Sequence, residues 1–284
     1  MNKNLFIVAV LIMCFTACSK TNQKNTLQYE GLKGQVKSTF SYCYEAKCRF
    51  GKIEKGDIAR TSVLPEWSNL YPAYQREYNS DGNITKISTY FQDGETYKVT
   101  KIEYIGDKIA SICTYDYEGN ILYSEKYSYN RGKLMDYEKS LYYDKHHDIT
   151  HKYEIVNNKV VADSSFVKGE LSRITLYNDD NEFTHVSTTI DTEGNESDKS
   201  IITKDKFGRT IKIECRGNSW EGYLMQNTYN EVGWISSIIR EESGKIKELV
   251  FDYQGYDKIG NWISRVIYID GELEALEERK IEYY

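Results

Sequence analysis

The sequence predicts an all-β protein, an antiparallel meander of repeated hairpins that forms an elongated, twisted sheet and partly folds over itself. The first observation is composition, because the chain has 26 tyrosines but only two prolines in 284 residues. Chains rich in Tyr, Ile, Thr and Val favour strands. The other two observations are a ladder of regularly spaced turn signals and an alternation of side chains between them.

The turn signals are short tetrads that contain glycine, and early in the chain they recur at steps of 12 or 13 residues. Glycine supplies the positive φ that a tight hairpin turn requires. Where glycine is missing, Asn and Asp take its place because they also tolerate a left-handed backbone. The glycines that define the early steps are Gly82, Gly94, Gly106, Gly119 and Gly132.

Between the turns, successive side chains alternate between two faces. From Ile121 to Tyr129 every second residue is Ile, Tyr or Glu, and the residues between them are Leu, Ser or Lys. A period of two is typical of half-buried antiparallel strands. One strand and one turn fill about 11–14 residues, so we expect about fifteen strands from Tyr78 onward. A meander of that length must curl, split into two packed sheets or form a long ribbon.

The N-terminal residues predict export. Lys3 precedes an apolar run from Leu5 to Phe15, the pattern of a secretory signal peptide over residues 1–17. The run has 11 residues, whereas a membrane-spanning helix needs about 20. Residues 18–30 are polar and lack periodicity, so we expect a tether there.

The motif F-T-A-C at residues 15–18 resembles the lipobox of bacterial lipoproteins. In that family the cysteine is acylated and the chain is cut before it, so the resemblance implies lipid attachment at Cys18. Ordinary cleavage after Ala17, or use of Cys14, is the alternative. Because residue 19 is Ser and not Asp, the same resemblance favours the outer membrane, with the periplasmic or surface side left open.

Two further regions follow the tether. Residues 31–73 are expected to form an N-terminal β segment and a loop, and residues 74–284 a β-repeat domain. The segment 272–282 fits a final helix through Leu273 and Leu276, and an edge strand through Leu273 and Ala275.

Three segments carry a resemblance to a known repeat. They are Y-N-S-D-G-N-I-T-K-I at 78–87, Y-D-Y-E-G-N-I-L-Y at 115–123 and Y-D-K-I-G-N-W-I-S-R-V at 256–266. These segments look like degenerate YD repeats of RHS-type proteins, and the resemblance covers about residues 74–284. It implies repeated hairpins but no inherited enzyme, since the chain is too short for the toxin-enclosing shell of large RHS proteins.

Charge and motifs exclude several functions. The chain has 37 basic and 43 acidic residues, a net charge of −6, and no basic block. Nucleic acid binding depends on clustered positive charge, so we expect no such partner. Phosphate-binding glycine loops and a G-x-S-x-G motif are absent from the sequence, so we expect neither an enzyme nor a cofactor.

Histidines and cysteines predict no site. His147 and His151 share a face of a strand but lie about 13 Å apart at about 3.3 Å per residue. One zinc ion at about 2.0–2.1 Å per ligand cannot join them, and we expect no metal. Export allows disulfides, but the pairing of Cys43, Cys48, Cys113 and Cys215 is left open. On one continuous strand the odd offset between Cys43 and Cys48 would point them to opposite faces.

The candidate ligand-binding residues are Trp234 and Trp262. Each follows a turn glycine, in V-G-W-I and G-N-W-I, and they are 28 residues apart. Together they could form a stacking platform for a sugar or a peptide, because indole rings offer flat apolar faces. The alternative is that the rings cover the sheet as cross-strand pairs.

The sequence therefore predicts a non-enzymatic, lipid-anchored cell-envelope β-repeat protein that serves as a binding or scaffold module for a protein or glycan. A polysaccharide-processing enzyme with paired carboxylates is the alternative. A role beside toxin or immunity proteins is the third possibility and rests on the resemblance alone.

Overall fold

The computed structural model describes residues 25–59, 72–141, 149–218 and 220–284. These ranges contain one short helix and nineteen strands, so the predicted all-β antiparallel meander is confirmed. Within them no helix is both long and apolar enough to cross a bilayer. The predicted signal peptide and Cys18 lie outside the described residues.

The elements occur in the following order along the chain. The helix is α2 (Thr26–Tyr29), and the strands are β1 (Val36–Arg49), β2 (Lys52–Ile58), β3 (Ala73–Tyr78), β4 (Ile84–Tyr90), β5 (Thr96–Ile105), β6 (Lys108–Asp116), β7 (Ile121–Asn130), β8 (Lys133–Leu141), β9 (Ile149–Val156), β10 (Lys159–Val167), β11 (Glu170–Asn181), β12 (Thr184–Asp191), β13 (Glu196–Lys204), β14 (Thr210–Gly217), β15 (Trp220–Tyr229), β16 (Ile235–Glu242), β17 (Lys245–Tyr256), β18 (Trp262–Ile269) and β19 (Glu272–Tyr283).

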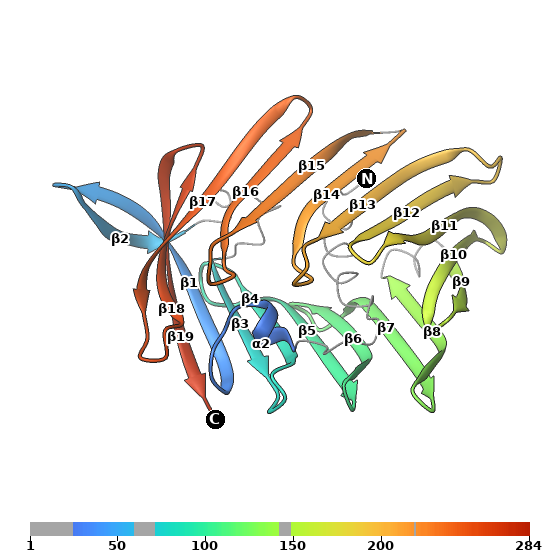
Figure 1. Ribbon diagram of the computed structural model, residues 1–284, viewed down its shortest axis with the longest axis horizontal. Helices are drawn as coiled ribbons and strands as arrows, with labels where there is room; N and C mark the ends of the chain where they lie inside the picture. Colours follow the sequence, from blue (N-terminus) through green and yellow to red (C-terminus); the bar gives the residue numbers. More distant parts are fainter. Residues whose placement is uncertain (1–24, 60–71, 142–148, 219) are drawn as a thin grey trace.

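All strands belong to one sheet that curls into a nearly closed, barrel-like shape. Successive strands from β3 to β8 and from β9 to β19 are antiparallel neighbours, and β1 lies between β3 and β19. Figure 1 shows β3 to β8 as a lower row and β10 to β17 as an upper row, joined on the left by β1, β18 and β19. The first strand of the chain therefore joins the start of the meander to its end.

The last segment is a central strand. Residues 272–282 form part of β19, which pairs with β18 on one side and with β1 on the other. The predicted alternatives were a helix and an edge strand, so both are corrected. Burial alternates along much of β19, which fits the strand pattern through Leu273 and Ala275.

Residues 25–30, which the sequence places in the tether, are folded. Asn25 caps α2, because its side-chain oxygen accepts a hydrogen bond from Gln28 N at 3.0 Å while Gln28 Oε1 accepts one from Asn25 N at 3.1 Å. Leu27 and Leu32 are buried in a cluster with Val36 and side chains of β3 to β7. The tether prediction therefore concerns only residues 18–24, which lie outside the described ranges.

The repeated unit builds one kind of turn. Between β17 and β18, the Asp257 carboxylate accepts hydrogen bonds from the N–H groups of Ile259 and Asn261, both at 2.9 Å. Gly260 has φ 85°, the left-handed conformation that closes such a turn. Equivalent hydrogen bonds are made by Asn79, Asp116, Asp191, Asp205 and Asn230. The Asp or Asn of each unit therefore stabilises a turn.

A buried ion pair lies where β1 joins the two ends of the meander. Glu277 on β19 is fully buried, and its carboxylate accepts hydrogen bonds from Arg265 Nε at 2.7 Å and Tyr74 OH at 2.6 Å. Burial raises the pKa of the Glu277 carboxyl, but the Arg265 charge and the Tyr74 hydroxyl outweigh it and the net pKa is lowered. The ion pair and Tyr74 together connect β18, β19 and β3.

We predict that Glu277→Gln lowers the free energy of unfolding by about 3–5 kcal/mol, because Arg265 then keeps a buried charge without a counter-charge. The matched control is Glu278→Gln on the next residue, whose partner Lys55 lies at the surface. That change should cost less than about 1 kcal/mol. Urea unfolding measures both, and equal losses would contradict the role given to Glu277.

Candidate functional site

The segment of residues 25–34, which contains α2, lies across the tips of several repeat turns. Asn25 Nδ2 donates a hydrogen bond to Asp81 O at 2.6 Å, and Leu27 N donates one to Gly82 O at 3.0 Å, both in the β3–β4 turn. In the β13–β14 turn, a Cβ added to Gly208 would lie 3.1 Å from the Tyr29 ring. The segment thus touches turns that are distant in sequence.

Two residues of the YD-like units bind the backbone of this segment. Trp234 Nε1 donates a hydrogen bond to Gly31 O at 3.2 Å. Asn261 is fully buried, and its side chain accepts from Lys33 N at 2.8 Å and donates to Lys33 O at 2.9 Å and to Tyr283 OH at 2.8 Å. Polar side chains at two turn tips therefore hold residues 25–34, which we call the N-terminal latch.

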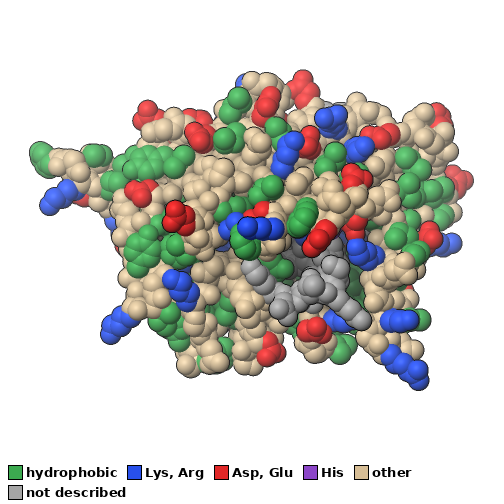
Figure 2. Space-filling model, in the orientation of Figure 1, with side chains coloured by type: hydrophobic (Ala, Val, Ile, Leu, Met, Phe, Trp, Pro, Cys, Tyr) green, Lys and Arg blue, Asp and Glu red, His purple; other side chains and the backbone are tan. Residues whose placement is uncertain are grey.

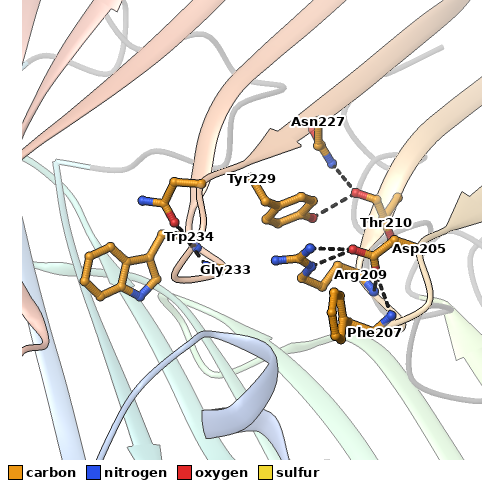
Figure 3. A network of polar contacts seen from close by, with 9 residues as sticks. Asp205, Phe207, Arg209, Thr210, Asn227, Tyr229, Gly233 and Trp234 are labelled. Carbon is orange, nitrogen blue, oxygen red and sulfur yellow. Dashed lines mark hydrogen bonds and ion pairs between the residues drawn. The ribbon is translucent and has the colours of Figure 1, made fainter.

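Figure 3 shows two of these turn tips from close by. Arg209 binds the Asp205 carboxylate through Nε at 2.7 Å and Nη2 at 2.6 Å, and its guanidinium lies 4.3 Å from the centre of the Tyr229 ring. Trp234 occupies the tip of the β15–β16 turn. At the first tip the charged groups bind each other, and at the second the Trp234 indole binds Gly31 O.

The predicted stacking residues come together but are buried. Trp234 is 4% and Trp262 5% exposed, and Tyr253 lies between them with ring centroids at 5.1 and 5.6 Å. The Arg279 guanidinium covers the Trp262 ring at 3.6 Å. A ligand could stack on either indole only after neighbouring side chains moved aside, so this role stays a prediction.

A second cluster, which sequence reasoning missed, surrounds Glu125 on β7. Its buried carboxylate accepts hydrogen bonds from the hydroxyls of Tyr123, Tyr127 and Tyr137, the last two at 2.5 and 2.6 Å. The available signal was the spacing Y-x-E-x-Y at residues 123–127, which places a carboxylate between two tyrosines on one face. Tyr137 faces Tyr127 across the β7–β8 pairing.

The phenols of this cluster are held in their neutral, hydrogen-donating form. Burial raises the pKa of Tyr123, Tyr127 and Tyr137, and the negative charge of Glu125 raises these pKa values further. Each hydroxyl can therefore donate to the carboxylate throughout the physiological pH range. Three hydroxyls bind the Glu125 carboxylate, and a carboxylate has about four acceptor positions, so it can accept one further donor.

The cluster continues across the place where β8 meets β9. The Tyr137 and Tyr153 rings lie 4.6 Å apart in an edge-on contact, and His151 stacks on Tyr153 at 6.0 Å. Burial raises the pKa of Tyr177 on β11, and the charges of Asp163 and then Glu125 add to this effect. We call this set the junction cluster; its members are Tyr123, Glu125, Tyr127, Tyr137, His151, Tyr153, Asp163 and Tyr177.

His151 is part of this cluster and is not a catalytic base of the serine type. Its Nδ1 lies 2.8 Å from Asp163 Oδ1 and 3.3 Å from Ser165 Oγ. A Ser-His-Asp triad needs the serine and the aspartate on different ring nitrogens, so that one can pass a proton while the other orients the ring. Here both meet the same nitrogen, and the set cannot act as a triad.

No three His, Cys, Asp or Glu side chains of the described ranges are placed to hold a metal ion. His146 and His147 lie outside those ranges. Cys43, Cys48, Cys113 and Cys215 are free thiols in the structure. Cys43 and Cys48 share the continuous strand β1; Cys43 is buried, and Cys48 lies between the exposed residues Lys47 and Arg49.

No family model matches the sequence, and no curated protein matches it. The chain is similar to a porin-like protein from Bacteroides uniformis ATCC 8492, with 12% identity, 87% of this chain and 98% of that chain covered, and a TM-score of 0.37. It is also similar to a porin-like protein from Bacteroides vulgatus ATCC 8482, with 12% identity, 89% of this chain and 99% of that chain covered, and a TM-score of 0.39. A chain of the TcdB2-TccC3-Cdc42 structure has 10% identity, with 83% of this chain and 18% of that chain covered and a TM-score of 0.26. Likenesses at this level transfer no function.

We predict that Asn261→Ala loosens the N-terminal latch and lowers the free energy of unfolding by about 1–3 kcal/mol, because Lys33 N and O lose their partner. Asn195→Ala is the matched control, since Asn195 occupies the same place in its turn and its amide binds within that turn. Its effect should be within about 0.5 kcal/mol. Hydrogen exchange at residues 27–34 should quicken in the first variant, and unchanged exchange would refute the latch.

The latch should also weaken in acid. Burial raises the pKa of the Asp257 carboxyl, but hydrogen bonds from the Tyr283 hydroxyl and from N–H groups of its turn outweigh it and the net pKa is lowered. A carboxyl with a lowered pKa stabilises the fold above its unfolded pKa of about 3.9, and this stability is lost as the pH falls through the folded value. Asp257→Asn should therefore reduce the free energy of unfolding at neutral pH. The further decrease in this free energy below about pH 4 should be smaller in the variant than in the parent chain. Free energies of unfolding that fall in parallel with decreasing pH in the parent chain and in the variant would contradict this role of Asp257.

Proposed function

We propose that the protein is a non-enzymatic, lipid-anchored β-repeat protein of the bacterial cell envelope, and that it binds a glycan at the junction cluster. The envelope location and the anchor are supported by the signal-peptide pattern and by the lipobox-like residues before Cys18. The YD-like units supply the repeated turns, and their Asp residues stabilise those turns. Because these Asp carboxylates are bonded within their own turns, we assign them no catalytic role.

The observation that carries the binding role is the convergence of phenol rings and carboxylates in the junction cluster. Tyr137 and Tyr153 are half-buried, so part of each residue reaches solvent near Glu125 and Asp163. Sugars present apolar C–H faces that pack on flat rings and hydroxyls that bind the polar rim, and tyrosine offers both features. This chemistry favours a glycan over a peptide.

The paired-carboxylate enzyme remains the second candidate, because the negative charges of Asp163 and Glu125 both raise the pKa of Tyr177. A glycosidase needs one carboxyl to donate a proton and the other to act as a base or nucleophile. Glu125 is instead occupied by three phenols, and Asp163 binds His151 at 2.8 Å. The arrangement suits binding better than proton transfer.

A glycan array with the unlipidated chain from Ser19 onward tests the binding role. Tyr137→Ala should weaken binding to the best glycan by roughly tenfold, or about 1.4 kcal/mol. Tyr117→Ala is the control, because Tyr117 is 65% exposed at a turn. Absence of any glycan ligand would overturn the proposal, and release of shortened sugars from a bound polysaccharide would establish the enzyme instead.

The anchor has a separate test. Cys18→Ser should abolish incorporation of labelled fatty acid and release the protein from the membrane fraction, because the acylated thiol is lost. Cys14→Ser is the control and should leave both properties unchanged. Fatty-acid labelling that persists in the Cys18→Ser variant would contradict lipid attachment at this residue.

A further inference from the structure

The hairpin of β1 and β2 extends beyond the barrel-like sheet. β19 accompanies β1 only as far as Glu45, and β3 only as far as Tyr42. From Ala46 to Lys55 the described pairing is that of β1 with β2 alone. Figure 1 shows this hairpin projecting from the left side of the molecule. A two-stranded ribbon gains little stability by itself in water, so a projecting one suits contact with another surface.

The tip of this hairpin is an exposed aromatic residue. Phe50 has a relative exposure of 105%, so its ring is fully in solvent. Its φ is 52°, a conformation that is uncommon for a bulky residue, and Gly51 follows with φ 75°. The turn thus holds the ring at the tip of the hairpin. No apolar contact there offsets the unfavourable exposure of the aromatic side chain to water.

Basic side chains surround the aromatic tip. Lys47, Arg49 and Lys52 are exposed. Glu54 is the acidic residue among them, and its carboxylate lies 3.6 Å from Arg49 Nε in a solvent-exposed ion pair. Arg49 faces Lys52 across the hairpin next to the turn. The whole chain carries a net charge of −6, so this positive end is opposite in sign to the rest of the protein. Figure 2 shows basic and apolar atoms together on the part that projects at the left.

We propose that the β1–β2 hairpin docks the protein on an anionic lipid surface. Phe50 enters the headgroup region, while the long stems of the neighbouring cations lie along it and their charges meet lipid phosphates. Because the chain as a whole carries a net negative charge, attraction at this basic end orients the molecule. The docking does not require the lipid at Cys18 or the glycan role of the junction cluster.

The base of the hairpin contacts both the surface of the sheet and its core. Lys55 Nζ binds Glu278 Oε2 at 2.6 Å and lies 3.8 Å from the centre of the Tyr44 ring. Cys43, just inside the base, is fully buried in the core cluster with Leu249 and Ile267. The projecting part is therefore joined directly to the packed interior.

Vesicle co-sedimentation tests the proposal with the unlipidated chain from Ser19 onward, which contains every described element. The chain should bind phosphatidylglycerol vesicles and lose most of this binding between about 0.1 and 1 M salt, because the headgroup attraction is screened. Phosphatidylcholine vesicles should bind it at least tenfold more weakly.

Two variants locate the contact. Phe50→Ser and Lys52→Glu should each weaken binding to phosphatidylglycerol vesicles by roughly tenfold, because one loses the apolar tip and the other reverses a charge at the tip. Ile246→Ser is the matched control, since Ile246 is 65% exposed beside another hairpin turn. Its binding should equal that of the parent chain.

Several results would overturn the proposal. They are a parent chain that ignores phosphatidylglycerol, a Phe50→Ser variant that binds as well as the parent, and an Ile246→Ser variant that loses as much. Sedimentation velocity adds a further outcome. Phe50-dependent dimers that bind no vesicles would show that the hairpin contacts a second copy of the chain.

Discussion

The pairing of β1 with both β3 and β19 is the constraint on which the rest of the structure depends. A long meander has two unpaired edges, and such edges expose backbone donors and acceptors. Here one strand satisfies both, with Ser38 facing Glu77 on one side and Glu282 on the other. Closure at this point buries the Glu277–Arg265 pair and brings the turn tips around residues 25–34. It also leaves the far part of β1 to project with β2.

The repeated turn residues serve a local purpose everywhere and a long-range purpose in some places. Asp116 and Asp191 bind N–H groups within their own turns. Asn261 and Trp234 do more, because they reach residues more than 200 positions away. The same unit therefore builds the hairpins and holds the N-terminal latch. This double role explains why polar residues of a repeat resemble a site although they contact the protein's own backbone.

Local physics made the hairpins predictable, because glycine spacing and period-2 alternation are properties of neighbouring residues. The position of β1, the burial of Trp234 and the partners of His151 depend on strands far apart in sequence, and no local pattern carries them. Residues 25–30 read as a tether because Leu27 alone is apolar in α2 and a single turn of helix has no periodicity. The spacing of Trp234 and Trp262 did place them in one cluster, but spacing carries no information on exposure.

Hydrogen exchange of the β1 amides tests the closure most directly. If β1 joins β3 to β19, residues Ser38 to Tyr42 have a paired strand on each side, and their amides exchange only on global unfolding. They should be as slow as those of β18, whereas amides near Lys52 in the projecting hairpin should exchange far sooner. Exchange of residues 38–42 at the rate of the hairpin tip would show that β1 does not join β3 to β19.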